Sequence, residues 1–298
     1  AAPVLVGAWR SPVAHLHGGQ GVEGSNPFAP TIFSTDFEYG SPYGDPFVHP
    51  TLSTRRIIAY DSLIITVPNK PGAQLTTAAI LPALDAARFL GPLLDEIHDR
   101  HPELRLLVVD DGSSDGTAET ARAHGAEVLI HAVNRGKGAA LMTGFAWAIE
   151  QGIDWVFTLD SDGQHLPSDM AGFLDRAAAD DIDVIVGTRM DASEGMPWIR
   201  KATNRFTSAV VSSLAGCRIP DSQNGYRLFR VAVLKDLRIT TARYDFESEI
   251  LVRVARRGAR VDSVPTATVY GDEVSSINPI RDTVRFFRLA WRLSRDRD

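Results

Sequence analysis

Residues 106–117 read Leu-Leu-Val-Val-Asp-Asp-Gly-Ser-Ser-Asp-Gly-Thr, a hydrophobic run that ends directly in acidic and turn-forming residues. Residues 155–165 repeat this arrangement as Trp-Val-Phe-Thr-Leu-Asp-Ser-Asp-Gly-Gln-His. Ligands of open α/β sheets bind beyond the carboxyl ends of the strands. Carboxylates delivered there cost free energy unless cations or hydrogen-bond donors meet them. The two stretches therefore predict an α/β fold with its site where these strands end.

The chain around these stretches is regular from Thr76 onward, because short apolar runs alternate with helical patterns. This alternation is typical of βαβ units in a mainly parallel sheet. We expect strands at residues 78–81, 104–109, 127–131, 155–159, 183–187 and 261–266. We expect helices at residues 89–100, 118–124, 137–150, 168–179, 198–214 and 246–257. Residues 76–298 are thus predicted to form one Rossmann-like sheet flanked by helices.

Residues 1–75 are unlike the rest, since Gly, Pro, Ser and His are scattered through them and no helical or strand period persists. One strand is expected, within residues 56–67. Residues 24–27, Gly-Ser-Asn-Pro, resemble the translated T-arm of a transfer-RNA gene. We interpret this part as a poorly structured, atypical extension that follows from a wrongly assigned start codon; the alternative is a genuine, loop-rich extension.

Bulk properties narrow the class of protein. A formal net charge of −6 and a pI of 5.8 do not favour a nucleic-acid partner. Cys217 is the only cysteine, which excludes an internal disulfide and a cysteine-rich zinc site. No apolar run reaches the length of about 18 residues needed for a membrane-spanning helix, and the first residues lack a secretory pattern. We expect a cytoplasmic protein, with peripheral contact to the inner face of the membrane as a further option.

The two acidic clusters are candidate ligand sites. Along an extended segment Asp160 and Asp162 would face the same side. Hard oxygen ligands at this spacing suit Mg²⁺ or Mn²⁺, with a diphosphate supplying further ligands. Taken alone, each cluster could instead be a turn before a helix or a solvated loop. The occurrence of both clusters at strand ends favours a site.

Seven motifs follow one another in the regular part of the chain. They are residues 80–83 (Ile-Leu-Pro-Ala), 108–117, 134–138 (Asn-Arg-Gly-Lys-Gly), 159–165, 186–189 (Val-Gly-Thr-Arg), 221–229 (Asp-Ser-Gln-Asn-Gly-Tyr-Arg-Leu-Phe) and 246–249 (Phe-Glu-Ser-Glu). In this order they resemble glycosyltransferase family 2, and within it the dolichyl-phosphate mannose synthase type of polyprenyl-phosphate sugar transferase. The resemblance implies a GT-A type fold and inverting, metal-dependent transfer of a sugar from a nucleotide sugar. GDP-mannose and UDP-glucose are both credible donors.

The resemblance also implies roles for individual residues. The nucleotide sugar is expected at Pro82, Asp85, Asp111, Lys137 and Asp160, and the metal at Asp160, Asp162 and Gln164. Leu84-Asp85 departs from the Asn-Glu pair that is usual in the family. For Lys137 the alternative is an exposed lysine at a helix start, and for His165 a structural hydrogen bond is favoured over metal binding.

The choice of acceptor depends on bases and cations. A hydroxyl acceptor needs a general base, whereas a phosphate acceptor is already anionic and needs cations. The Glu-Asp pair common in relatives that glycosylate hydroxyls is not found. Arg189 and Arg227, which are suited to forked phosphate contacts, are therefore expected to hold a polyprenyl phosphate, and they complete a catalytic set with Asp160 and Asp162. The alternative is that both arginines are solvated, and Asn224, where relatives usually have Ser, departs from the family pattern.

The last helical segment, residues 279–295, is amphipathic. One stripe is basic (Arg281, Arg285, Arg288, Arg292 and Arg295) and the neighbouring stripe is apolar (Ile280, Val284, Phe287 and Trp291). Phe286, Leu289 and Leu293 join the apolar side. Such a helix could lie on an anionic membrane, or it could pack its apolar side on the domain and leave the arginines in water.

Two other functions stay open. The chain could be a nucleotide-binding module without transfer activity. It could also act on a saccharide or small-molecule hydroxyl, with Asp221, Asp245 or Glu247 as the base. A Rossmann dehydrogenase is disfavoured, because no Gly-x-Gly-x-x-Gly follows the first strand.

Overall fold

The computed structural model describes residues 58–60, 63–65, 75–189, 198–243, 245–267 and 279–296. The chain divides into two units, Ala1–Asn69 and Lys70–Asp298. In the first unit β1 (Ile58–Tyr60) pairs antiparallel with β2 (Leu63–Ile65). The single strand expected within residues 56–67 was therefore wrong, because this segment contains two paired strands. The rest of the expected extension lies outside the described residues and stays a prediction.

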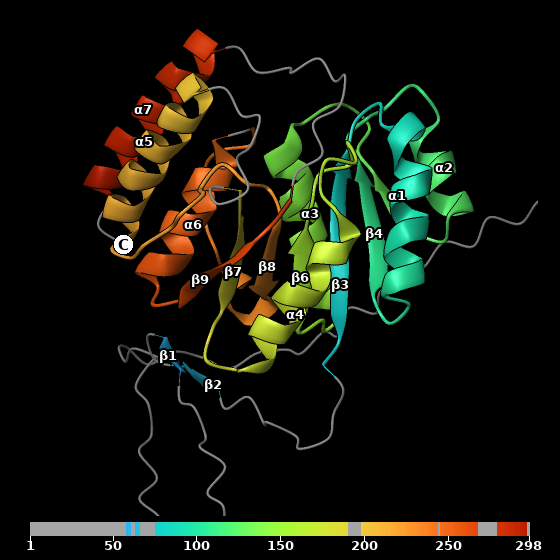
Figure 1. The fold of residues 1–298 in the computed structure, drawn as a ribbon, viewed down its shortest axis with the longest axis horizontal. Helices are drawn as coiled ribbons and strands as arrows, with labels where there is room; N and C mark the ends of the chain where they lie inside the picture. The colour runs from blue at the N-terminus through green and yellow to red at the C-terminus, as the bar shows by residue number, and fades with distance from the viewer. Residues whose placement is uncertain are drawn as a thin grey trace, which may run out of the picture. The chain divides into compact units, whose positions relative to one another are not determined.

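The described part of the second unit is built on a seven-stranded sheet with the order β5-β4-β3-β6-β8-β7-β9 (Figure 1). The strands are β3 (Thr77–Ala83), β4 (Arg105–Asp110), β5 (Glu127–Ile130), β6 (Trp155–Thr158), β7 (Val184–Thr188), β8 (Arg227–Arg230) and β9 (Val261–Pro265). Every pairing is parallel except the two made by β8. The predicted α/β class with a mainly parallel sheet is confirmed.

Helices cover both faces of this sheet. They are α1 (Ala87–Arg100), α2 (Thr117–Ala123), α3 (Lys137–Glu150), α4 (Met170–Ala178), α5 (Trp198–Ala215), α6 (Phe246–Arg256) and α7 (Pro279–Arg295). Two 3-10 turns add to them, η1 (Pro167–Asp169) and η2 (Val231–Leu234). None of the helices in the described residues combines the length and apolar character needed to cross a bilayer.

Alternation along the strands divides the core into two layers. Within β3, Ala78 and Ile80 join the cluster formed with α3, α5, α6 and α7, whereas Ala79 and Leu81 join the cluster formed with α1, α2 and α4. Both layers are apolar along the inner strands, as expected for a parallel sheet covered on both faces. The sheet therefore provides a rigid support for the loops at its edge.

Strand β8 was not predicted, and the chain inserts it antiparallel between β6 and β7. Its four residues carry an arginine at each end, and this pattern has no strand period long enough to be recognised. Tertiary pairing with both neighbours decides its conformation. Its insertion brings the 221–227 segment beside the end of β6.

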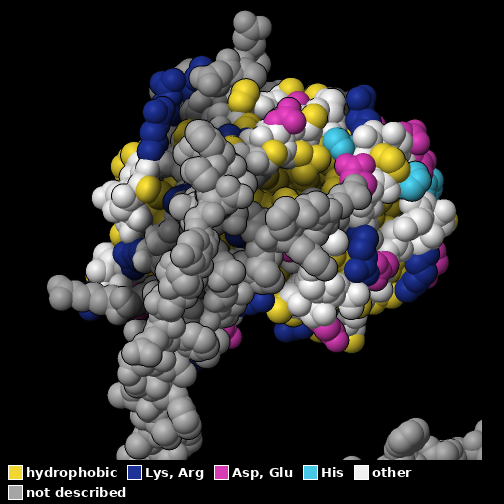
Figure 2. Space-filling model, turned by 90° about the horizontal axis from the view of Figure 1, so that it is seen from below, with side chains coloured by type: hydrophobic (Ala, Val, Ile, Leu, Met, Phe, Trp, Pro, Cys, Tyr) yellow, Lys and Arg dark blue, Asp and Glu magenta, His cyan; other side chains and the backbone are white. Residues whose placement is uncertain are grey.

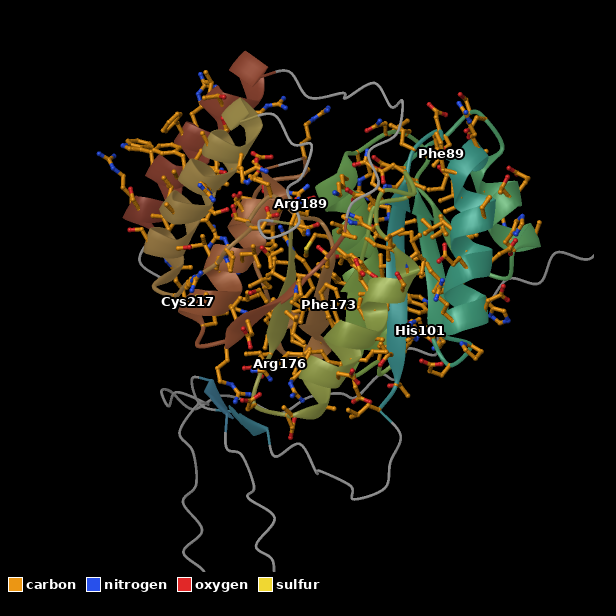
Figure 3. The ribbon with its side chains drawn as sticks, viewed as in Figure 1. Phe89, His101, Phe173, Arg176, Arg189 and Cys217 are labelled. Carbon is orange, nitrogen blue, oxygen red and sulfur yellow. The ribbon has the colours of Figure 1, made fainter. Side chains whose placement is uncertain are left out.

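The strand register brings three loops together at one edge of the sheet. Ala83 of β3 lies opposite Asp110 of β4, and Ile80 lies opposite Thr158 of β6. The loops that follow these strands therefore begin side by side. Figure 3 shows Arg189 and Phe89 toward this end of the domain, and His101 and Arg176 toward the opposite end.

Candidate active site

The loops after β3 and β4 are tied to each other by hydrogen bonds. The Asp85 N–H donates to Ser113 Oγ at 2.9 Å, and the Ser114 N–H donates to Asp85 Oδ1 at 2.9 Å. Asp85 has φ 50°, in the left-handed region, and its residue is exposed, whereas Pro82 is buried in β3. Of the two residues predicted for the nucleotide pocket, Pro82 thus lies within the strand and Asp85 in the loop after it, and their contact with a nucleotide stays a prediction.

Asp111 is buried and fixes the loop that leads into α3. Its Oδ1 lies 2.6 Å from His131 Nδ1 and accepts the Arg135 N–H at 2.9 Å, while its Oδ2 accepts the Gly136 N–H at 2.6 Å. A carboxylate that satisfies several donors is well compensated for its burial. The structure therefore gives Asp111 a loop-positioning role, and its predicted contact with the base or ribose stays a prediction.

Lys137, the first residue of α3, links two loops. Its Nζ lies 2.5 Å from Asp160 Oδ1 and also contacts Glu247 Oε1 at the start of α6. The lysine side chain is only 20% exposed, so it is not a solvated lysine at a helix start. Burial alone would lower the pKa of Lys137, but the carboxylates of Asp160 and Glu247 outweigh burial and raise it above 10.5. Lys137 is therefore a permanent cation in the site.

Asp160 and Asp162 follow β6 in a bent segment. The expectation of an extended segment was wrong, because β6 ends at Thr158 and residues 161–162 form a turn in which the Gln164 N–H donates to Asp162 Oδ1 at 2.9 Å. Burial would raise the pKa of Asp160, but the Lys137 ammonium holds it well below its ordinary value of 3.8. Asp160 is thus ionised and partly exposed at the edge of the sheet.

His165 packs under this turn. Its Nε2 lies 3.7 Å from Asp160 Oδ2, and its ring lies 5.0 Å from the ring of Tyr226. The side chain is 6% exposed, and Nδ1 has no hydrogen-bond partner among the described residues. These contacts do not include the structural hydrogen bond that was favoured for His165, and its role stays a prediction.

The loop after β6 has oxygen donors that suit a hard cation, but the side chains described there do not form a metal site by themselves. No group of three or more His, Cys, Asp or Glu side chains within the described ranges is arranged to hold a metal ion. The predicted set of Asp160, Asp162 and Gln164 supplies oxygen donors alone, which is the chemistry that Mg²⁺ and Mn²⁺ prefer. These residues fit such a metal if the diphosphate of a donor completes the coordination.

A pocket of 330 Å³ lies beside this loop. One wall belongs to α1, with Arg88, Phe89 and Glu96, and the other wall includes Asp162 and Gln164. Two of the three predicted metal ligands line this pocket. It therefore gives a small molecule access to residues 160–164, which we call the acidic turn.

Arg189, directly after β7, is held by a buried carboxylate. Its Nε donates to Asp221 Oδ2 at 2.8 Å and its Nη2 donates to Asp221 Oδ1 at 3.0 Å, a forked pair with a fully buried partner. The side chain of Arg189 is 12% exposed. The structure fixes its orientation, so it is not a freely solvated arginine.

Arg227, at the start of β8, is buried among backbone carbonyls. Its Nε, Nη1 and Nη2 donate to the carbonyl oxygens of Asn224, Glu247 and Ser222 at 2.8, 2.9 and 2.9 Å. The residue is 2% exposed, and burial lowers its pKa while Glu247 opposes that shift. Direct contact of Arg227 with an acceptor phosphate stays a prediction; in the structure it joins the 222–224 segment to α6.

Glu247 is the site residue that sequence reasoning missed, since it was considered only as an alternative base. It contacts Lys137 Nζ, and its Oε2 lies 3.6 Å from Arg227 Nη2. The motif Phe246-Glu247-Ser248-Glu249 was a weak signal, because the helix dipole alone accounts for two acidic residues at a helix start. The pairing with Lys137 could not be read from the sequence, since the two residues are far apart along the chain.

Close packing of α3 against the segment before α6 holds Lys137 close to Glu247. The Gly138 N–H donates to the Ala242 carbonyl at 3.0 Å, and a Cβ at Gly138 would lie 2.7 Å from Phe246 Cβ. We expect Gly138→Ala to lower the free energy of unfolding by about 1 to 3 kcal/mol, because the neighbouring backbone and ring must shift. Urea denaturation followed by circular dichroism measures this change.

The matched control for Gly138→Ala is Gly172→Ala in α4. A Cβ at Gly172 meets no atom within 4 Å. This substitution should therefore raise the free energy of unfolding by about 0.5 to 1 kcal/mol, the usual gain for Gly→Ala in a helix. Equal effects of the two substitutions would contradict the tight contact at Gly138.

Comparison with known proteins identifies a family model and several relatives that this chain resembles. The chain matches the family model described as "Glycosyl transferase family 2" over residues 78–238. It is 31% identical over 201 residues to the undecaprenyl-phosphate mannosyltransferase of Micrococcus luteus, covering 64% of this chain and 82% of that protein. It is 28% identical over 213 residues to the UDP-N-acetylglucosamine–dolichyl-phosphate N-acetylglucosaminyltransferase of Methanococcus voltae, covering 64% and 84%.

A solved structure shares the fold. The glucosyl-3-phosphoglycerate synthase of Mycobacterium tuberculosis, crystallised with Mn²⁺, UDP-glucose and phosphoglyceric acid, superposes with a TM-score of 0.54 at 20% identity, covering 74% of this chain and 79% of that one. At this identity the likeness shows the fold alone. It confirms the expected GT-A type of architecture.

Proposed function

The chain belongs to glycosyl transferase family 2 and is a glycosyltransferase, and from this premise we propose that it transfers a sugar from a nucleotide sugar to a polyprenyl phosphate. The transfer would be a single in-line displacement with inversion at the anomeric carbon. The two relatives described above, an undecaprenyl-phosphate mannosyltransferase and a dolichyl-phosphate N-acetylglucosaminyltransferase, support a lipid phosphate as the acceptor.

The observation that carries the choice of acceptor is the state of Asp221 and Glu247, two of the three candidate bases. Asp221 is fully buried and both its oxygens accept hydrogen bonds from Arg189. Glu247 contacts Lys137 and lies near Arg227. Carboxylates held by cations are poor general bases, because their lone pairs are occupied. A phosphate acceptor needs no base, so this arrangement favours it over a hydroxyl acceptor.

The donor side of the proposal rests on the acidic turn. Asp160, Asp162 and Gln164 would hold Mg²⁺ or Mn²⁺, and the metal would supply charge neutralisation for the nucleoside-diphosphate leaving group. Lys137 would keep Asp160 ionised and correctly placed beside that group. Asp111 would fix the loop before α3 against the nucleotide, which agrees with its three hydrogen bonds.

The acceptor side rests on the two arginines. We propose that Arg189, oriented by the forked pair with Asp221, contacts the acceptor phosphate. Arg227 would act mainly by fixing Ser222, Asn224 and the backbone of Glu247 around the site. The donor sugar stays open between mannose and glucose, each with its usual nucleotide.

The test measures nucleoside-diphosphate release by the purified chain with GDP-mannose, UDP-glucose or UDP-N-acetylglucosamine as the donor. We expect release with one donor, only when Mn²⁺ or Mg²⁺ and a short polyprenyl phosphate are both present. Chelation by EDTA should lower the rate by at least about 10²-fold, and added Mn²⁺ should restore it.

The matched control acceptor is the same polyprenol without its phosphate, which should not support release. Equal rates with the alcohol and the phosphate would overturn the acceptor and favour a hydroxyl-glycosylating enzyme. Failure to bind any of the nucleotide sugars would overturn the proposed donor class.

A further inference from the structure

The outer surface of α5 and α7 exposes large apolar side chains. In the described part of the chain eight large hydrophobic side chains are exposed, and four of them lie on these two helices. They are Phe206, Val284, Phe287 and Trp291, exposed by 54, 44, 51 and 61%. We call these four side chains the outer apolar patch. Apolar groups gathered on a surface mark an interaction site more often than scattered ones do.

The patch is continuous across the two helices. Val284, Phe287 and Trp291 follow a spacing of three and four residues, so they lie on one face of α7. The ring of Phe206 on α5 lies 6.2 Å from the ring of Phe287. Close contact between the two aromatic rings joins the helices into one surface.

The patch is not what attaches α7 to the domain. Leu289 and Leu293 are 3% and 1% exposed and belong to the core cluster, with Phe286 packed beside them. Of the two arrangements that the sequence left open, packing of the apolar stripe on the domain does not hold for Val284, Phe287 and Trp291, which are exposed. These three side chains are therefore available to a partner.

Positive charge lies beside the patch. Helices α5 and α7 together carry eight Lys and Arg residues and one acidic residue, Asp282, in a chain whose formal net charge is −6. Arg288 is exposed and forms no ion pair with any described residue, and the Arg295 guanidinium lies 4.0 Å from the Trp291 ring. Figure 2 shows Lys and Arg side chains beside hydrophobic ones on the side of the molecule where α5 and α7 lie.

We propose that the outer apolar patch and its arginines dock this enzyme on an anionic lipid bilayer. Aromatic rings would enter the zone between headgroups and acyl chains, and the arginines would meet the headgroup phosphates. The charge favours an anionic membrane, because headgroup phosphates would attract Arg288 and Arg295, whereas a neutral apolar partner would not. The inference rests on the proposed function in one respect, since a polyprenyl phosphate acceptor is found in such a bilayer.

The test is co-sedimentation of the full chain with vesicles of phosphatidylcholine alone or mixed with phosphatidylglycerol. We expect binding to the mixed vesicles and little binding to the neutral ones. Arg288→Gln should weaken binding about fivefold, and the double substitution Phe287→Ala with Trp291→Ala should weaken it at least about tenfold. Matched controls are Arg238→Gln and Val133→Ala, which alter exposed residues outside α5 and α7 and should leave binding unchanged.

Turnover of a short polyprenyl phosphate without vesicles separates this inference from the proposed function, because the patch variants should keep that turnover. Equal sedimentation of the wild-type and patch variants with anionic vesicles would overturn the docking surface while leaving the function intact. A wild-type dimer in analytical ultracentrifugation that Trp291→Ala dissociates, without vesicle binding, would assign the patch to a second copy instead. Vesicle binding by a chain that does not use lipid phosphate would support the surface and overturn the acceptor.

Discussion

Lys137→Met is expected to lower kcat/KM for sugar transfer by about 10² to 10³-fold, the usual effect of removing one preorganised electrostatic group from an active site. The reason is the position of the Nζ atom, 2.5 Å from Asp160 Oδ1 and in contact with Glu247. Without the ammonium, the carboxylates of Asp160 and Glu247 lose the cation that they share in a partly buried region. Asp160 would then lose both its orientation and the partner that keeps its pKa low.

Steady-state kinetics with the preferred donor measures this effect. Lys235→Met is the matched control, because it removes an exposed lysine outside the site and should leave the rate unchanged. Lys137→Arg keeps the charge and should retain more activity than Lys137→Met. A Lys137→Met enzyme that works within about threefold of wild type would show that the lysine is only structural.

Arg227→Met should lower the free energy of unfolding by about 3 to 5 kcal/mol, which is the typical cost of removing one partner from a buried, hydrogen-bonded charge cluster. The substitution leaves the carbonyls of Ser222, Asn224 and Glu247 without their donor in a buried environment. It also takes a cation from beside the Glu247 carboxylate. Each buried group that loses its partner stays desolvated, and the apolar Met side chain offers no hydrogen bond in its place.

Arg230→Met is the control on the same strand. The Arg230 side chain is 22% exposed, pairs with Asp180 and Asp183 and lies 4.6 Å from the Trp155 ring, so the loss should be about 1 to 2 kcal/mol, smaller than for Arg227. Urea denaturation of both variants gives the two free energies. Similar losses for Arg227→Met and Arg230→Met would contradict the buried role of Arg227.

Local patterns in the sequence were enough to predict most of the fold. Residues 137–150 were predicted as a helix and form α3 with the same limits, because this segment combines helix formers with a regular apolar face. The strands β3, β4 and β6 were found because they are continuous apolar runs that end in turns. Strand β8 was missed because its conformation depends on pairing with β6 and β7, which no local pattern reports.

The acidic residues of the candidate site could be named from the sequence, but the residues with which they pair could not. Asp111, Asp160 and Lys137 come from separate motifs, and the sheet register brings their loops to one edge as expected. The contact of Lys137 with Glu247 depends on how α6 packs against α3, which is a tertiary property. For the same reason the burial of Arg227 could not be foreseen, since an arginine at a motif position reads equally well as a ligand or as a structural cation.

The place of β8 in the sheet has a consequence for the order in which the protein is assembled. On the ribosome β7 is made before either of its sheet neighbours, β8 and β9, whereas β3, β4, β5 and β6 pair only with each other until β8 arrives. The amino-terminal half of the sheet, with Asp111 and Asp160, can therefore form during translation. Arg189 and Glu247 can take their positions in the site only after the later strands have been synthesised. A nascent chain released before β8 would carry Asp111, Lys137 and Asp160 but would lack Arg227 and Glu247.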